Sequence, residues 1–164
     1  MKGPWVTQSY FNRNEASRLA KIKEHGNALW HRMGDVGYLD DKNRLWFCGR
    51  KNQRVRTADG TLFTIQCEGI FNIHPKVKRS ALVGIGENKN QRPVIVIEPE
   101  QFSELNNNSA RNLLIKELLE LGGQHKHTHQ IKNVLIHQNF PVDIRHNAKI
   151  SREQLAQWAT QKIP

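Results

Sequence analysis

Two short apolar runs constrain most strongly what this chain can fold into. Residues 80–85 and 93–97 are rich in β-branched and other apolar side chains, which predicts two buried strands. After Ser109, a good N-cap residue, apolar side chains recur with the 3.6-residue period of a helix until Gly122, which suits the C′ position. Buried strands followed by a long amphipathic helix indicate a mixed domain rather than an all-α or all-β one.

Weaker patterns complete this domain. They predict, in chain order, a hairpin broken at Asp59-Gly60, a helix at residues 68–73, a strand at about 132–137 and a last helix whose capping box is Ser151 with Gln154. Strands and helices therefore interleave, with only a few strands. We predict an α+β fold for residues 50–164: a small mixed domain with a two-stranded hairpin and a sheet of about three strands packed by helices.

The first third of the chain has no pattern that could close a core by itself. Asn12 and Glu15 have the spacing of a capping box, and the apolar stripe that follows predicts a helix at about residues 14–25. Short strands are expected at about 28–32, 37–39 and 45–48, with a turn at 40–43. Because three short strands and one helix bury little apolar surface, we expect residues 1–49 to be a remnant of a larger domain.

Positive charge is concentrated in the first half of the chain. The formal net charge is +10, and residues 1–80 hold 15 of the 25 Lys and Arg but 7 of the 15 Asp and Glu. Between residues 42 and 56, six cations are interleaved with aromatic side chains, as in segments that track a nucleic-acid backbone. One interpretation is therefore a stand-alone basic nucleic-acid-binding module. The other is a hairpin that turns Leu45 and Phe47 inward and its charges toward water.

Several classes of protein are disfavoured. No apolar run approaches the roughly 20 residues that span a bilayer. The N-terminus lacks the continuous apolar stretch of a secretory signal, so we expect a cytoplasmic protein. Cys48 and Cys67 are too few for a disulfide framework and lack the spacing of metal ligands, so no metal site is expected from them.

Three segments could carry charge-based chemistry. Asp35 stands between Gly34 and Gly37, where it could accept two hydrogen bonds from a diol or simply be a solvated turn residue. Arg50 follows Gly49 at the expected domain junction and could contact an anion or belong to a linker. Lys149 lies in a loop before the last helix, where an ammonium group could hold a phosphate or carboxylate or face solvent only.

A fourth segment contains three alternate histidines. His125, His127 and His129 would share one face of a strand and could hold zinc, but no acidic or cysteine partner is adjacent. A polar loop is the favoured interpretation.

Taken in order, these segments resemble the C-terminal end of the acyl-adenylate-forming superfamily, which includes acyl-CoA synthetases, fatty acyl-AMP ligases and luciferases. Residues 33–40 are similar to its TGDxGYxD segment, residues 45–50 to its GR hinge segment and residues 73–77 to its HPxV segment. The stretch 142–149 resembles long-chain acyl ligases of the kind that form β-lactones in olefin biosynthesis. The resemblance extends over nearly the whole chain.

The resemblance implies a role for each candidate residue. Asp35 would accept the ribose hydroxyls of ATP, and Arg50 would contact the ribose or a phosphate. Lys149 would be the adenylation lysine, bridging the substrate carboxylate and the α-phosphate while negative charge develops there. Asn52 would be the hinge about which a lid swings between two half-reactions. ATP and Mg²⁺ are the implied cofactors, and CoA is one implied acceptor.

Some positions depart from the family pattern. Asn52 stands where Asp or Lys is usual, and Ala148 stands where a glycine commonly precedes the lysine. The loop at residues 57–61 is more acidic and less open than the glycine-rich loop of CoA ligases, which fits attack by an intramolecular hydroxyl to give a β-lactone.

The chain also lacks the phosphate-gripping loop and the acyl pocket of the family. We therefore expect a remnant in residues 1–49 and a lid domain in residues 50–164, which would act with the missing N-terminal domain of the same polypeptide on a carboxylic, fatty acid substrate. Alone, the 164 residues are expected to be inactive.

Overall fold

The structure, a computed structural model, describes residues 1–25, 28–143 and 146–163, without the side chains of residues 146–148. Along these residues the chain forms, in order, α1 (Asn14–Ala20), β1 (Lys21–Lys23), β2 (Leu29–His31), β3 (Asp35–Leu39), β4 (Leu45–Arg50), the 3₁₀ turn η1 (Lys51–Gln53), β5 (Val55–Thr57), β6 (Gly60–Leu62), α2 (Thr64–Phe71), β7 (Val77–Ile85), β8 (Arg92–Pro99), the 3₁₀ turn η2 (Phe102–Leu105), α3 (Asn108–Gly123), β9 (Asn133–Ile136), β10 (Val142–Asp143), β11 (His146–Ile150) and α4 (Arg152–Lys162). No helix among the described residues is long and apolar enough to cross a membrane.

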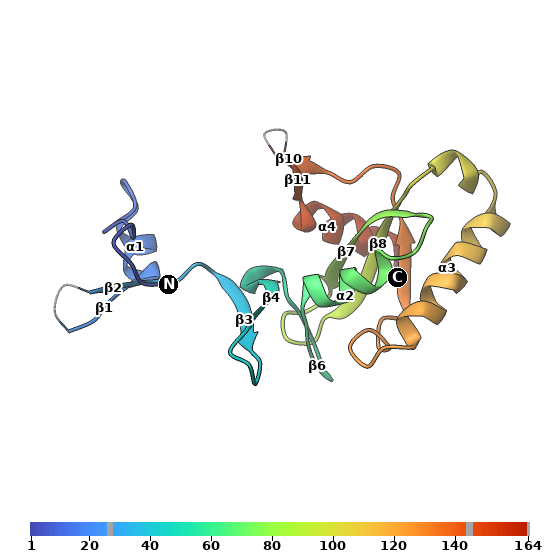
Figure 1. Cartoon of the computed structure of the whole chain (residues 1–164). Coiled ribbons are helices and arrows are strands. Elements are labelled where there is room, and N and C mark those ends of the chain that lie inside the picture. Colours follow the sequence, from blue (N-terminus) through green and yellow to red (C-terminus); the bar gives the residue numbers. More distant parts are fainter. Residues whose placement is uncertain (26–27, 144–145, 164) are drawn as a thin grey trace.

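The body of the molecule is built on a three-stranded sheet in the order β7-β8-β9 (Figure 1). β7 and β8 are antiparallel, with Leu82 opposite Ile95, whereas β9 runs parallel to β8. Parallel neighbours need a long crossover, and α3 provides it. The predicted α+β class, the three-stranded sheet and the hairpin at Asp59-Gly60, which is β5–β6, are confirmed.

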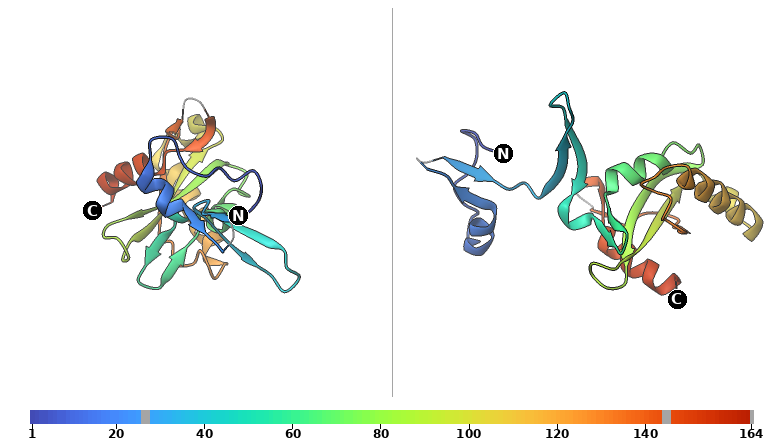
Figure 2. Two further views of the ribbon diagram at one scale, coloured as in Figure 1. Left: turned by 90° about the vertical axis from the view of Figure 1, so that its left-hand side faces the viewer. Right: turned by 90° about the horizontal axis from the view of Figure 1, so that it is seen from below.

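Each face of this sheet carries its own core. On one face Leu82 and Ile95 pack with side chains of α2 and α3, and on the other Val83 and Val94 pack with side chains of α4. Figure 2 shows α4 on the side of the sheet opposite α2 and α3. Because helices cover both faces, consecutive residues of β7 and β8 are buried. This double burial is the physical reason for the two apolar runs.

The turn between β3 and β4 is organised by Asp40. Its carboxylate accepts hydrogen bonds from the backbone N–H groups of Lys42 and Arg44 and from Nε1 of Trp46, each at 2.9 Å. These bonds, that from Trp46 foremost, lower the pKa of Asp40 to about 2. The predicted turn at residues 40–43 is confirmed.

The predicted boundaries of both helices in the first half are wrong. The helix expected at residues 14–25 ends at Ala20, because residues 21–23 pair with β2 as strand β1. Asn12 does not cap that helix: it adopts a left-handed φ of 51°, and Arg13 is the N-cap residue. α2 spans Thr64–Phe71 and so begins before the predicted range of 68–73.

Capping differs in the second half as well. The N-cap of α3 is Asn107 and not Ser109, and its side chain accepts a hydrogen bond from the N–H of Ala110 at 2.8 Å. Ser151 is the N-cap residue of α4 as predicted, but its side chain makes no capping hydrogen bond, so the box with Gln154 is not formed.

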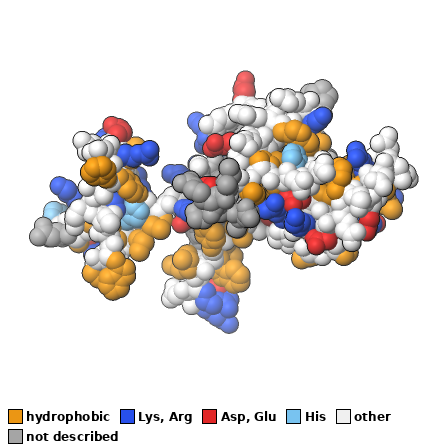
Figure 3. Space-filling model, turned by 90° about the horizontal axis from the view of Figure 1, so that it is seen from above, with side chains coloured by type: hydrophobic (Ala, Val, Ile, Leu, Met, Phe, Trp, Pro, Cys, Tyr) orange, Lys and Arg blue, Asp and Glu red, His pale blue; other side chains and the backbone are white. Residues whose placement is uncertain are grey.

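The prediction that Leu45 and Phe47 turn inward is wrong. Their exposed fractions are 75% and 51%: within the described residues α2 packs on the end of β4 at Cys48 and Gly49, and no layer covers Leu45 and Phe47. They line a hollow of about 900 Å³ whose other apolar residues include Leu19, Ile22, Trp30 and Met33. Hydrophobic side chains are visible at the surface of the N-terminal elements at the left of Figure 3. Exposed apolar side chains gathered around one hollow are typical of an interaction surface.

Gly122 lies inside α3 and not at the C′ position predicted for it. A Cβ atom at this glycine would lie 2.9 Å from Cζ and 3.1 Å from Cε1 of Phe71, a side chain that is only 1% exposed. The glycine therefore permits the close contact between α2 and α3.

We expect Gly122→Ala to lower the free energy of unfolding by about 1 kcal/mol. Overpacking against Phe71 costs about 1–3 kcal/mol, which exceeds the gain of up to about 1 kcal/mol in helix propensity. Urea unfolding of the 164-residue chain measures the difference. Gly123→Ala is the matched control: no atom lies within 4 Å of its Cβ position, so it should be neutral or stabilising. A stabilised Gly122→Ala variant would contradict the packing argument.

Candidate active site

Asp35 and Arg50 meet at the open end of the β3–β4 hairpin. The antiparallel register places them directly opposite each other, and Arg50 Nη1 lies 2.8 Å from Asp35 Oδ1. Arg50 also donates a hydrogen bond to the carbonyl of Met33 at 3.1 Å. Both side chains remain partly exposed, at 55% for Arg50 and 32% for Asp35. An exposed pair of this kind contributes at most about 1 kcal/mol to stability, and both groups stay accessible to a ligand.

The turn η1, which contains Asn52, follows directly after Arg50. The backbone N–H of Lys51 donates to the carbonyl of Gly34 at 2.8 Å, which ties the turn to the start of β3. On the other side, Gly49 has a φ of +118° and packs so closely on α2 that a Cβ would collide with the side chain of Thr64. Asn52 is thus an exposed residue at the point where the chain leaves the hairpin for the sheet domain.

Lys149 is an exposed residue of β11, two positions before the N-cap of α4. Its strand is held by the pairing of Val142 with Ile150 and by a hydrogen bond of 2.8 Å from the N–H of Ser151 to the carbonyl of Pro141. Residues 144 and 145, part of the stretch 142–149 singled out in the sequence, lie outside the described residues.

One cavity of about 810 Å³ brings three of the four predicted residues together. Arg50, Asn52 and Lys149 all line it. Three further cations, Lys51, Arg54 and Arg56, line it too, and none of its described lining residues is acidic. Asp35 is not a lining residue but is joined to the cavity through Arg50. Five cations around one hollow favour a polyanionic ligand.

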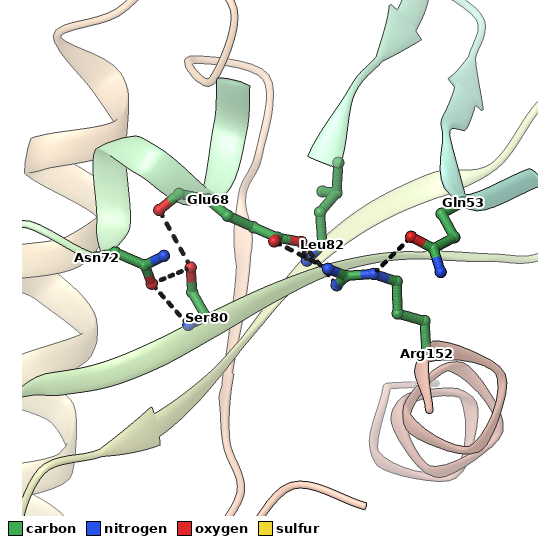
Figure 4. Close-up of polar contacts among 6 residues, drawn as sticks. All are labelled: Gln53, Glu68, Asn72, Ser80, Leu82 and Arg152. Carbon is green, nitrogen blue, oxygen red and sulfur yellow. Dashed lines mark hydrogen bonds and ion pairs between the residues drawn. The ribbon is translucent and has the colours of Figure 1, made fainter. Parts of the chain in front are cut away.

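Sequence reasoning missed a buried ion pair that contacts the cavity residue Gln53, the pair of Glu68 in α2 and Arg152 in α4 (Figure 4). Arg152 Nη2 donates to Glu68 Oε2 at 2.9 Å, and Nη1 lies 2.7 Å from Oε1. The N–H of Leu82 donates to Oε1 at 2.8 Å, and Arg152 Nε donates to Gln53 Oε1 at 3.2 Å. An acidic residue between Cys67 and the apolar pair Ile70 and Phe71 was the available signal.

Burial governs the electrostatics of this pair. The side chains of Glu68 and Arg152 are 9% and 15% exposed. Burial raises the pKa of Glu68 above its ordinary value, and the charge of Arg152 and the hydrogen bond from Leu82 act in the opposite direction without cancelling it. Burial also raises the pKa of the Cys67 thiol to about 12, so this cysteine is not a candidate nucleophile.

The three alternate histidines lie in a turn after α3, as the polar-loop interpretation predicted. His127 Nε2 contacts the carbonyl of Gln66 at 3.2 Å, and the rings of His125 and His127 are 5.9 Å apart. Among the described residues, no group of three or more His, Cys, Asp or Glu side chains is placed to hold a metal ion.

Comparisons with known proteins show which proteins the chain is similar to. No family model matches the chain. An olefin β-lactone synthetase from Xanthomonas campestris is 51% identical over 98% of this chain, which covers 29% of that relative. The o-succinylbenzoate CoA synthetase of Bacillus subtilis, solved with its acyl-adenylate intermediate, matches 94% of the chain with a TM-score of 0.71 and 22% identity; the match covers 29% of that protein. The chain is homologous to the C-terminal region of the acyl-adenylate-forming ligases.

A further ligase of known structure shares the fold. ATP-bound MatB from Rhodopseudomonas palustris matches 98% of the chain with a TM-score of 0.74 and 18% identity, and the match covers 30% of that protein. At this identity the structural match shows the fold of acyl-adenylate-forming ligases and no more. The relatives give no support to a stand-alone nucleic-acid-binding module. The chain spans about 29% of the length of the synthetase that it matches.

We expect Arg152→Met to be destabilising, and more so at pH 8 than at pH 5. Removing one partner of a buried pair costs about 3–5 kcal/mol, because a buried charge is left uncompensated. Without Arg152 the already raised pKa of Glu68 rises further, so the folded state binds a proton more tightly than the unfolded state. Stability is then gained below the raised pKa and lost as the pH rises through it.

Urea unfolding of the wild-type chain and the variant at both pH values checks this expectation. The double variant Arg152→Met/Glu68→Gln is the matched control, because its neutral amide can still accept the hydrogen bond from Leu82. Its stability should lack the pH dependence that the raised pKa of Glu68 gives to the wild type and, more strongly, to Arg152→Met. If Arg152→Met lowered the free energy of unfolding by the same amount at pH 5 and pH 8, Glu68 would not be the group that causes the pH dependence.

Proposed function

We propose that residues 50–164 form the mobile lid of an ATP-dependent ligase that activates a fatty carboxylic acid as its acyl-adenylate, and that residues 1–49 belong to the larger adenylate-binding domain. The observation that carries this proposal is the basic cavity shared by Arg50, Asn52 and Lys149 beside Asp35. The 51% identity to an olefin β-lactone synthetase supports it.

In the proposed first half-reaction, a carboxylate oxygen of the fatty acid attacks the α-phosphorus of ATP. The bond from that phosphorus to the bridging oxygen of pyrophosphate breaks, and pyrophosphate leaves with the electron pair. Lys149 bridges the carboxylate and the α-phosphate and stabilises the negative charge that develops. Asp35 accepts hydrogen bonds from the ribose hydroxyls, and Arg50 contacts the ribose or a phosphate. The described residues offer no ligand cluster for Mg²⁺, which would arrive bound to ATP.

In the proposed second half-reaction, the acyl carbonyl is attacked and AMP leaves. The name of the Xanthomonas relative favours an intramolecular hydroxyl as the nucleophile, which loses its proton and closes a β-lactone. A CoA thiol would give a thioester instead. Asn52 is the proposed pivot of the lid between the two half-reactions, because it lies where the chain passes from the hairpin to the sheet domain.

The partner required by this proposal is the remainder of the same polypeptide. It would cover the hollow lined by Leu45 and Phe47, whose exposure is hard to reconcile with a free surface. It would also supply the phosphate-gripping loop and the acyl pocket. The 164 residues alone should therefore bind ATP weakly and turn over no substrate.

A fusion tests the proposal directly. The chain is placed in the Xanthomonas synthetase instead of its matching segment, and carboxylate-dependent exchange of pyrophosphate into ATP is measured. We expect exchange in the fusion and a loss of about a hundredfold to a thousandfold with Lys149→Ala, since transition-state charge stabilisation of this kind is worth about 10²–10³.

Lys116→Ala, at a 74% exposed position of α3, serves as the control and should leave exchange unchanged. Near-normal exchange by Lys149→Ala would show that Lys149 is not the lysine that stabilises charge during adenylate formation. Exchange by the 164 residues alone would contradict the proposal that they need the remainder of the polypeptide. A fusion without exchange would contradict the proposed function of the chain. Binding of the chain to generic DNA with a steep salt dependence would favour the nucleic-acid alternative.

A further inference from the structure

One hydrogen bond joins the proposed hinge to the segment that carries the proposed lysine. Arg152 Nε donates to Gln53 Oε1 at 3.2 Å, between residues 99 positions apart in the sequence. Gln53 directly follows Asn52, and Arg152 comes three residues after Lys149. All four residues line a second cavity, of about 570 Å³. The contact therefore connects two functional segments that have no direct link along the chain.

The guanidinium group of Arg152 has a fixed orientation. Its Nη2 donates a hydrogen bond to Oε2 of Glu68, and its Nη1 lies 2.7 Å from Oε1 as an ion pair without a hydrogen bond of its own; the carboxylate is held in turn by the N–H of Leu82 (Figure 4). Because a guanidinium is planar and rigid, the hydrogen bond at Nη2 and the ion pair at Nη1 together restrict the direction of the Nε–H bond. That bond points to Gln53. The buried pair thus presents one donor to the hinge turn.

The position of Lys149 depends on the same arginine. Ser151 and Arg152 begin α4 immediately after β11, so the anchored arginine also fixes where the strand of Lys149 ends. Lys149 itself is exposed, and its long side chain needs a well-placed backbone to reach a reacting group reproducibly.

We propose that Gln53 and Arg152 are positioning residues: their hydrogen bond couples the turn at Asn52 to the placement of Lys149, so that the lid closes with the lysine aligned. This inference rests on the proposed function. It assigns the contact to the adenylation half-reaction, because only there does Lys149 meet the carboxylate and the α-phosphate. The second half-reaction, started from a supplied acyl-adenylate, does not need that alignment.

Gln53 separates this coupling role from a merely structural one. It is half-buried and contacts the arginine without belonging to the buried pair, so its replacement leaves Glu68 and Arg152 together. Gln53→Met keeps the length of the side chain and removes the acceptor oxygen. Gln53→Glu keeps an acceptor at the same place. The two variants form a matched pair.

The experiment uses the fusion with the Xanthomonas synthetase. For Gln53→Met we expect kcat of pyrophosphate exchange to fall about tenfold, as for a lost hydrogen bond to a charged group, with the KM for ATP changed less than about twofold. Gln53→Glu should restore exchange to within about twofold of the wild type. Consumption of a supplied acyl-adenylate should match the wild type for both variants, and thermal unfolding of the 164-residue variants measures separately what the lost hydrogen bond costs in stability.

Each other outcome has a definite meaning. Exchange by Gln53→Met at the wild-type rate, in a fusion that Lys149→Ala inactivates, overturns the coupling and leaves the proposed function intact. The coupling is also overturned if Gln53→Met slows both half-reactions equally, or if Gln53→Glu does not restore the rate of exchange. A wild-type fusion without exchange overturns the proposed function itself.

Discussion

The carboxylate of Glu68 is the constraint on which the rest of the sheet domain depends. A carboxylate that is 9% exposed must be paired and hydrogen-bonded, because transfer of an isolated charge into the interior costs several kcal/mol. Arg152 and the N–H of Leu82 meet that requirement from α4 and β7. The positions of α2, β7 and α4 are therefore specified together. A shift of any one of them would leave a buried charge without its partner. The apolar cores on the two sheet faces are therefore held in a fixed position relative to each other.

This arrangement explains how an exposed lysine can be held in a defined place. Leu155 and Ala159 of α4 are fully buried against β7 and β8, and Arg152 anchors the first turn of the same helix. β11 is thereby tied to a rigid element at its C-terminal end, while Lys149 stays free of the core. The role proposed for Lys149 needs both properties: a backbone in a fixed place, and a side chain that, among the described residues, has no recorded hydrogen bond or ion pair.

The sequence predicted those features that depend on local patterns. β7 and β8 were predictable because both faces are buried, and the turn at Asp40 because an Asx residue organises its own backbone. Asn107 and Ser109 are both acceptable caps, so local chemistry could not choose between them. Gly122 was misplaced because its role depends on Phe71, which lies far away in the sequence. The pair of Glu68 and Arg152 joins residues 84 positions apart: an acidic residue among apolar ones was a local signal for Glu68, but no local pattern identifies Arg152 as its partner. Asp35, Arg50 and Lys149 were identified by resemblance, whereas their approach to one cavity required the fold.

The positive charge and the exposed apolar face have one explanation. Met33, Gly34 and Lys51 line both the apolar hollow and the basic cavity, so the two surfaces are continuous. A partner that covered only the hollow would leave five cations at its edge with Asp35 as the one counter-charge described beside them, and an anion alone would leave Leu45 and Phe47 in water. A partner that brings an apolar cover and a polyphosphate to the same place satisfies both surfaces at once. The net charge of +10 is therefore better understood as half of a ligand site at a domain boundary than as a footprint for nucleic acid.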